Sequence, residues 1–417
     1  MKKIEIRNLG PINECKMSFS SFNVITGKQS SGKSTIAKSL YFFLSLKDIL
    51  GRLTFEHHHP GVFGDGNGDS LNKRFKWYLK CEFEEIFDVK NSAVREGTFL
   101  RMDYSDGIYA QVSFNKSLGI TYCNKLRDFI TYLENKNGDS LEKNFNESTQ
   151  KEIDDFFGID YSPVYIPAGR SLITVLGNQF ELFFSTLSDD NKSLIDLCTR
   201  SYLMNVMRIK PLFGKGLSKL WKEQYRNGVV EKAIPYLEKV INGDYYYSNG
   251  EEYLQLNDGQ KISVNMASSG QQEALWIYNI LLYYAHSSVK KFYIIEEPES
   301  NLFPESQQYI TKFLGLIANH GNPMLINTHS PYVLGELNNM VYAGTISGRE
   351  KKKRTFDVIE KECQLKFESL QAFFVEDGLL TDCLDYEIKQ IDNTKLDAIS
   401  GVINEEFDKL LEIEKGK

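Results

Sequence analysis

The stretch Gly27-Lys28-Gln29-Ser30-Ser31-Gly32-Lys33-Ser34-Thr35 follows the short apolar run Phe22–Thr26 and precedes the apolar segment Ile36–Leu46. Gly, any four residues, then Gly-Lys-Ser is the pattern of a phosphate-binding loop between a strand and a helix. Its glycines let backbone N–H groups close around phosphate oxygens, and the helix N-terminus adds its positive end. In such a loop Lys33 reaches the β- and γ-phosphates, and the Ser34 hydroxyl binds Mg²⁺. The pattern predicts an ATP and Mg²⁺ site rather than an ordinary glycine-serine turn.

Length and composition limit the class of protein. The 417 residues suffice for two or three domains, and an apolar fraction of 41% is ordinary for a globular protein. No apolar run approaches the ~20 residues of a membrane span, and the N-terminus lacks the apolar core of a secretion signal, so we expect a cytoplasmic protein. The net charge of −7 argues against a surface devoted to nucleic acid, but leaves a local basic groove open. The six cysteines have no paired spacing, which argues against disulfides or structural zinc.

Two short patterns before residue 80 resemble metal sites. His57-His58-His59 could suggest a metal ion, but consecutive side chains rarely converge on one ion, and an exposed loop is expected instead. Residues 65–69 imitate the opening of a calcium loop. Ser70 stands where that loop needs its sixth-position glycine and Lys76 where it needs its twelfth-position glutamate, so calcium is rejected.

Alternation and turn signals predict the other elements. A β-hairpin is expected over residues 3–19 and an antiparallel meander over 98–122, followed by helices to residue 157. Tyr161–Arg170 gives a short strand and a turn. Because ligands often lie at such strand ends, Arg170 is a candidate phosphate contact, with a structural salt bridge as an equal alternative. Residues 190–240 predict a broken helical lobe, and 244–264 return to strand.

Three polar clusters follow in the second half. Ala267–Glu273 precedes an apolar helix over 274–285, the strand 292–295 ends in Glu296 and Glu297, and the strand 324–327 ends before His329. Glu296 can hold the metal, and Glu297 can orient or deprotonate the attacking water. His329 can hydrogen-bond the γ-phosphate. Each cluster alone is ordinary, but their order after a phosphate loop predicts an ATPase.

This ordered set resembles the ABC-type ATPase heads of the SMC, RecF and OLD group. Gly27–Ser34 matches Walker A, Ala267–Gln271 a degenerate signature motif, Phe292–Glu297 Walker B, and His329 the switch histidine. The resemblance implies a head-to-head dimer whose signature motif closes over the ATP of the partner copy. The residues it assigns to that motif are Ser268, Ser269, Gly270 and Gln271.

The sequence departs from this family pattern in several places. Glu296 replaces the usual Walker B aspartate, as in OLD-like members, and Ser269 replaces a signature glycine. Phe303 stands where many relatives carry the D-loop aspartate, which leaves the rate and tightness of dimer closure open. No Q-loop glutamine is evident, and Gln179 is a weak match.

The expected fold is α/β: a P-loop NTPase of the ABC ATPase head type, with a mixed sheet, an antiparallel β subdomain and an inserted helical lobe. The expected ATPase core is discontinuous, and the expected parts are residues 1–50 and 160–340 (core), 51–159 (β meander plus helical insert), 190–240 (helical lobe within the core) and 341–417 (C-terminal helical extension).

Residues 374–382 look like the start of a Toprim nuclease domain, but no Asp-x-Asp pattern follows, so no nuclease is expected. Residues 382–414 predict amphipathic helices that cover the core or dock a partner. The basic run Arg349–Arg354 predicts a solvated loop, with a nucleic-acid contact as the alternative.

The resemblance therefore favours an ATPase subunit that dimerises on ATP and controls a separately encoded nuclease or toxin. Stand-alone OLD-like ATPases of this kind resemble components of bacterial anti-phage systems such as PARIS, Septu or retron modules. A RecF-like clamp on duplex DNA and a scaffold with structural ATP are the alternatives.

Overall fold

The computed structural model describes residues 2–59, 68–87, 94–136, 143–171, 195–287 and 289–392, together with Thr394, Glu405, Glu406 and Leu410. Its centre is an 11-stranded sheet in the order β6-β5-β4-β1-β2-β14-β13-β3-β12-β11-β7. These strands are β1 (Lys3–Leu9), β2 (Ile12–Ser18), β3 (Phe22–Gly27), β4 (Val94–Ser105), β5 (Ile108–Phe114), β6 (Leu118–Tyr122), β7 (Ser162–Ile166), β11 (Lys291–Glu296), β12 (Met324–Asn327), β13 (Leu370–Glu376) and β14 (Leu379–Asp382). The predicted α/β fold with a mixed sheet is confirmed.

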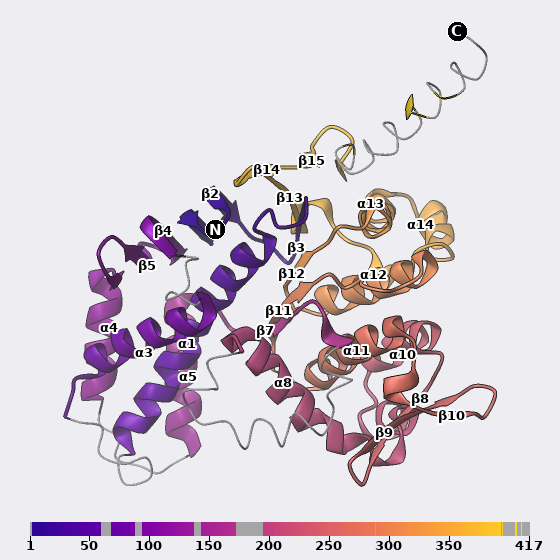
Figure 1. The fold of residues 1–417 in the computed structure, drawn as a ribbon, viewed down its shortest axis with the longest axis horizontal. Coiled ribbons are helices and arrows are strands. Elements are labelled where there is room, and N and C mark those ends of the chain that lie inside the picture. The colour runs from indigo at the N-terminus through magenta and orange to yellow at the C-terminus, as the bar shows by residue number, and fades with distance from the viewer. Residues whose placement is uncertain are drawn as a thin grey trace.

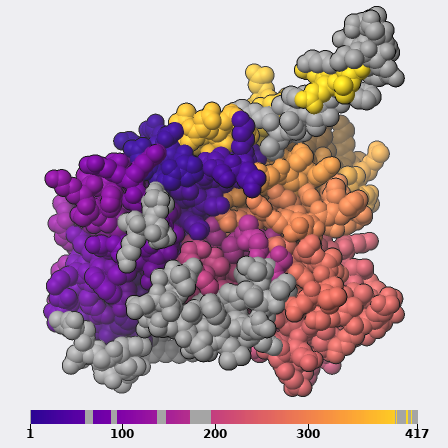
Figure 2. Space-filling view, in the orientation of Figure 1, coloured from indigo at the N-terminus to yellow at the C-terminus, as the bar shows by residue number. Residues whose placement is uncertain are grey.

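The helices form two groups, seen at the left and right of Figure 1. The first group is α1 (Lys33–His58), α3 (Leu71–Phe87), α4 (Asn124–Asn135) and α5 (Lys143–Phe157). The second is α8 (Leu197–Ile209), α9 (Leu217–Lys219), α10 (Gly228–Ile241), α11 (Ser269–His286), α12 (Pro304–Asn319), α13 (Pro331–Thr345) and α14 (Arg349–Thr355). In the space-filling view the indigo and purple N-terminal half lies beside the salmon and orange second half (Figure 2).

Two hydrophobic cores lie on opposite faces of the sheet. Because strand side chains alternate in direction, Phe292 and Ile294 of β11 join the core formed with α1, while Tyr293 and Ile295 join the core formed with α11 and α12. A strand buried on both faces carries a continuous apolar run, and β11 has one. This double burial fixes the strand whose end carries Glu296.

The sheet has a parallel part and an antiparallel part. Strands β13, β3, β12, β11 and β7 run parallel, and β1 pairs antiparallel with both β2 and β4. The hairpin predicted for residues 3–19 and the meander predicted for 98–122 are both confirmed, and β4 of the meander extends the main sheet through β1. The antiparallel strands therefore share one sheet with the phosphate loop.

The predicted helical lobe is described from residue 195 onward and contains α8, α9 and α10. Its helices are interrupted by a 3₁₀ turn over Lys210–Lys215 and a π turn over Leu220–Gln224. The strands predicted for 244–264 form a separate small sheet of β8 (Gly243–Ser248), β9 (Glu251–Leu256) and β10 (Lys261–Ser263). Gln179 and residues 190–194 lie outside the described residues.

The C-terminal extension predicted as helical from residue 341 contains α14 but also strands, which corrects the prediction. β13 enters the main sheet beside β3, and β14 pairs with β13. Residues 382–391, predicted as helix, contain the short strands β15 (Leu384–Asp385) and β16 (Gln390–Ile391). The Asp385 carboxylate accepts hydrogen bonds from the N–H groups of Glu387 and Ile388, which closes a turn instead of a helix.

Two predicted loops are helical. His57 and His58 form the last turn of α1, and ring nitrogens of His58 and His59 lie 2.8 Å from the carbonyl oxygens of Leu133 and Phe55. The run Arg349–Arg354 lies within α14 and is exposed.

Residues 65–67, named in the calcium comparison, lie outside the described residues. None of the helices in the described ranges combines the length and apolar character needed to cross a membrane.

Two glycines of α13 give a matched test of packing. A Cβ on Gly344 would lie 2.3 Å from the Leu365 carbonyl oxygen, whereas a Cβ on Gly335 would meet nothing within 4 Å. We predict that Gly344→Ala lowers the free energy of unfolding by roughly 1–3 kcal/mol through overpacking. Gly335→Ala should raise it by about 0.5–1 kcal/mol, because alanine loses less backbone entropy in a helix. Urea unfolding followed by tryptophan fluorescence checks both, and equal effects would contradict the packing.

Candidate functional site

The phosphate loop joins β3 to α1, as its sequence predicts. Gly27 has a φ of +141°, and a Cβ atom on it would lie 2.2 Å from the Val375 carbonyl oxygen. Gly32 has a φ of +109°, and a Cβ atom on it would lie 2.4 Å from the Ile12 side chain. Any larger residue would therefore displace the loop from β13 or β2. Lys28 reaches outward and pairs with Glu376 at 2.9 Å. Close packing against these strands fixes the curve of the loop.

Lys33 lies inside the loop and is only 6% exposed. Its ammonium donates hydrogen bonds to the carbonyl oxygens of Gly27 and Lys28, at 3.0 and 2.7 Å. Burial lowers the pKa of Lys33, and the carboxylates of Glu297 and Glu296 oppose that shift. A buried ammonium held among loop carbonyls and facing carboxylates suits an incoming phosphate, which supplies further negative charge.

Three parallel strand ends meet beside this loop. β12 lies between β3 and β11, with Asn327 in register with Ile25 on one side and Glu296 on the other. Carboxyl ends of parallel strands share one edge of a sheet, so the residues that follow all three strands gather there. The sequence-predicted residues Lys33, Glu296, Glu297 and His329 are therefore brought to a common edge.

The two glutamates at the end of β11 differ in environment. Glu296 is buried, and its Oε2 accepts a hydrogen bond from the Ala168 N–H at 3.3 Å. Glu297 has the unusual φ of +44°, held by its N–H bond to the Asn327 carbonyl at 2.8 Å. Its Oε2 accepts a hydrogen bond from the Ser300 hydroxyl at 3.0 Å. A left-handed backbone conformation is strained at a non-glycine residue. The chain turns at Glu297, so its carboxylate does not continue along the direction of β11.

His329 faces the second glutamate. Its Nε2 lies 3.7 Å from Glu297 Oε1. Burial and the nearby Lys33 lower the pKa of His329, against the opposing effect of Glu297, so the neutral ring is favoured at pH 7. Glu299, which the sequence interpretation did not single out, positions this turn: its Oε1 accepts hydrogen bonds from the Thr328 hydroxyl at 2.6 Å and the His329 N–H at 2.8 Å.

Several buried polar atoms at this edge lack partners among the described residues. They are Thr26 Oγ1, Ser31 Oγ, Glu296 Oε1, Glu299 Oε2, and both amide atoms of Asn327. Buried polar groups are nearly always hydrogen-bonded in folded proteins, so unpaired ones clustered beside a phosphate loop indicate a place for a polar ligand. Glu296 Oε1 and the exposed Ser34 hydroxyl are hard oxygen donors of the kind that Mg²⁺ prefers. These residues fit a magnesium nucleotide.

Arg170 lies behind the site rather than in it. It is fully buried, and its Nε lies 3.1 Å from Glu273 Oε2. The guanidinium donates hydrogen bonds to the carbonyl oxygens of Pro167, Glu296 and Glu297, at 2.6, 2.7 and 2.9 Å. Of the two alternatives open for Arg170, the structure shows the ion pair. It therefore joins the end of β11 to Glu273 of α11, which sequence reasoning also missed.

The signature segment begins α11. Ser268 caps the helix by accepting the Gln271 N–H, and the Gln271 side chain accepts the Ser268 N–H, a reciprocal capping box. Ser268 and Ser269 are exposed, while a Cβ on Gly270 would lie 2.6 Å from the Asn301 carbonyl oxygen. Among the described residues no hydrogen bond joins this segment to the phosphate loop of its own chain.

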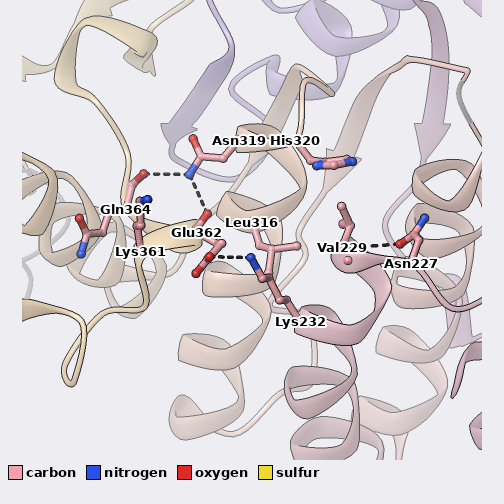
Figure 3. A pocket seen from close by; sticks show the side chains of 10 residues that line it. Asn227, Val229, Lys232, Leu316, Asn319, His320, Lys361, Glu362 and Gln364 are labelled. Atoms are coloured by element: carbon pink, nitrogen blue, oxygen red, sulfur yellow. Dashed lines mark hydrogen bonds and ion pairs between the residues drawn. The ribbon is translucent and has the colours of Figure 1, made fainter. Parts of the chain in front are cut away.

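A separate cavity of about 640 Å³ lies between α10, the end of α12 and residues 361–364 (Figure 3). Lys232 and Glu362 form an ion pair across it at 2.6 Å, and the Asn319 amide donates to the carbonyl oxygens of Glu362 and Gln364. Lys232 and Glu362 are already paired with each other, and none of the lining residues belongs to the predicted site. The sheet edge, not this cavity, is the candidate active site.

The family comparison agrees with this geometry. The model of the AAA ATPase domain matches residues 1–165 and 209–334, which is more than half of the chain. The chain belongs to this family. The matched segments contain the phosphate loop and both strand-end clusters.

Comparison with solved structures finds SMC head domains. The SMC head domain from Thermotoga maritima aligns with a TM-score of 0.39 at 11% identity, covering 91% of this AAA ATPase chain and 96% of that chain. An SMC head bound to the C-terminal winged-helix domain of ScpA gives 0.42 at 11%, covering 91% and 95%. A head with an extended coiled coil, bound to the C-terminal domain of ScpA derived from Pyrococcus furiosus, gives 0.35 at 10%, covering 91% and 96%. No curated protein matches the chain.

We predict that Arg170→Ala lowers the free energy of unfolding by roughly 3–5 kcal/mol, because it leaves Glu273 buried without its cation. Arg349→Ala is the matched control, since Arg349 is exposed and forms no ion pair with described residues. Urea unfolding measures both variants. A loss below about 1 kcal/mol for Arg170→Ala, the range of surface pairs, would show that the network adds little.

Proposed function

We propose that this AAA ATPase domain protein binds and hydrolyses Mg²⁺-ATP at the edge formed by β3, β12 and β11. The observation that carries the proposal is the gathering of Lys33, Glu296, Glu297 and His329 at one sheet edge, beside buried polar atoms that lack protein partners. Positioning and charge neutralisation account for most of the catalysis of phosphoryl transfer, and such an edge supplies both.

Each side chain has a role in this proposal. The ammonium of Lys33 turns from the loop carbonyls to the β- and γ-phosphates, and Ser34 and Glu296 hold Mg²⁺. The metal neutralises charge on the phosphate oxygens when it is bound. Glu297 accepts a proton from, or orients, the water that attacks the γ-phosphate, with ADP as the leaving group. The neutral His329 donates a hydrogen bond to the γ-phosphate and loses that partner after hydrolysis.

We infer that the complete site needs a second copy of the chain. The exposed Ser268 and Ser269 make no bond to their own phosphate loop. Two large apolar side chains, Met266 and Phe303, are 79% and 74% exposed, and they lie close in sequence to Gly270 and Asn301, which are in contact. Exposed apolar groups around a polar motif are typical of an interface that is buried on association. Phe303 then serves as an apolar anchor where many relatives have the D-loop aspartate.

The partner we propose is an effector protein encoded elsewhere, a nuclease or toxin, controlled by the ATP-closed and ADP-open states of a cytoplasmic homodimer or higher even-numbered oligomer. Anti-phage defence is the proposed setting, and it rests on the OLD-like resemblance of the motifs. A clamp on duplex DNA is the second candidate, favoured by the exposed cations of α14. A scaffold with structural ATP is favoured only by the loss of the D-loop aspartate at Phe303.

Subunit mixing tests the shared site. Lys33→Ala should abolish ATP binding, and Ser268→Arg should place bulk and charge in the closing interface, so each variant alone should lose ATPase activity. In a dimer that contains one copy of each variant, Lys33 of the Ser268→Arg chain faces Ser268 of the Lys33→Ala chain, so one of the two sites is complete. Since half of the dimers are of this kind at statistical mixing, roughly a quarter of all sites are complete. We predict that activity returns on mixing, as measured by phosphate release. A mixture that stays as inactive as its components, although the chains exchange, would contradict a shared site.

A further inference from the structure

A groove of about 800 Å³ lies between α13 and α14, at the end of α13 away from His329. Buried Ala343 and Ile359 and half-buried Ile346 line it, and Tyr342 and Val358 beside them are 58% and 70% exposed. An apolar strip with large exposed side chains is typical of a surface that another segment covers.

One wall of the groove is strongly basic. Within α14 five exposed cations accompany the single acid Glu350, and no ion pair with described residues neutralises them; they are Arg349, Lys351, Lys352, Lys353 and Arg354. Lys351 and Arg354 line the groove itself. Elsewhere surface lysines such as Lys222 and Lys232 are paired with glutamates. An apolar strip beside unpaired cations fits an acidic amphipathic helix, whereas a nucleic-acid backbone has no apolar face to cover the strip.

The chain passes close to this groove at Ile391. Ile391 of β16 is fixed to α13 by two hydrogen bonds with Asn338: its N–H donates to Oδ1 at 2.7 Å, and its carbonyl accepts from Nδ2 at 3.0 Å. The next residue of α13, Asn339, lines the groove. Ile391 is therefore held beside the residue of α13 that precedes the groove lining.

The sequence after Asp392 has the complementary character. Between residues 396 and 414 there are six acids and one lysine. Apolar residues recur at helical spacing along one stripe: Leu396, Ile399, Ile403, Phe407 and Leu410. The three described residues of this stretch, Glu405, Glu406 and Leu410, are exposed, Leu410 at 62%.

We propose that residues 396–414 dock as an acidic amphipathic helix into the α13–α14 groove of their own chain. The stripe covers the apolar strip, and the flanking carboxylates pair with the cations of α14. Tethering at Ile391 raises the effective concentration of the segment to the order of mM, so a weak intrinsic affinity suffices. Since α13 begins at Pro331, two residues after His329, the docked segment and the candidate ATP site would contact opposite ends of one helix. The docking itself does not depend on the proposed ATPase function.

Hydrogen–deuterium exchange of the full chain tests the docking. Phe407→Asp places a charge in the apolar stripe, and Ala398→Asp places the same charge on the opposite side of the same helix. We predict that amides of residues 339–346 and 355–359 exchange several-fold faster in Phe407→Asp than in wild type, and that Ala398→Asp behaves as wild type. Lys351→Glu with Arg354→Glu should accelerate the same amides, and so should raised salt.

Three results would overturn the proposal. One is equal exchange in wild type and Phe407→Asp. Another is protection that rises with protein concentration, which would assign the segment to the groove of a second copy. The third is salt-sensitive binding of a DNA duplex that Lys351→Glu abolishes while Phe407→Asp leaves groove exchange unchanged, which would assign the groove wall to nucleic acid.

Discussion

The parallel register of β3, β12 and β11 is the constraint on which the site depends. It places the phosphate loop, the Glu296-Glu297 pair and His329 at one edge, although they come from segments nearly three hundred residues apart. Each of these strands is buried on both faces, so none can slide or rotate without exposing apolar side chains. The chemistry of the edge thus rests on hydrophobic burial within the sheet.

A second, polar constraint lies directly behind this edge. Arg170 binds four backbone carbonyls and the Glu273 carboxylate, and Glu273 in turn accepts the N–H groups of Arg170 and Ser171. The two charged side chains of this network, Arg170 and Glu273, are both buried and paired, which is the condition under which buried charge is tolerated. Glu273 lies in the second turn of α11, whose start carries the signature segment. The network therefore connects the start of that helix to the backbone of Glu296 and Glu297.

Much of the active edge could be predicted from the sequence because its chemistry is local. The phosphate loop is one continuous stretch, and the apolar runs that end in Glu296-Glu297 and in Thr328-His329 are short and well bounded. The partners of the supporting residues could not be predicted, because Arg170 contacts backbone carbonyls and Glu299 contacts a hydroxyl and a backbone N–H, none of which a sequence pattern marks. β13 was missed for a related reason: its partner β3 lies about 350 residues earlier, and its apolar run resembled the start of another domain.

The central claim is that ATP closes two copies of this chain around a shared site. Light scattering on Glu297→Gln with and without Mg²⁺-ATP tests it most directly, since this variant should bind ATP and hydrolyse it poorly. The account predicts that ATP doubles the solution mass, or produces a higher even-numbered assembly, and that Lys33→Ala prevents the change. An unchanged mass with ATP demonstrably bound would contradict the account, and so would a dimer that forms equally well without nucleotide.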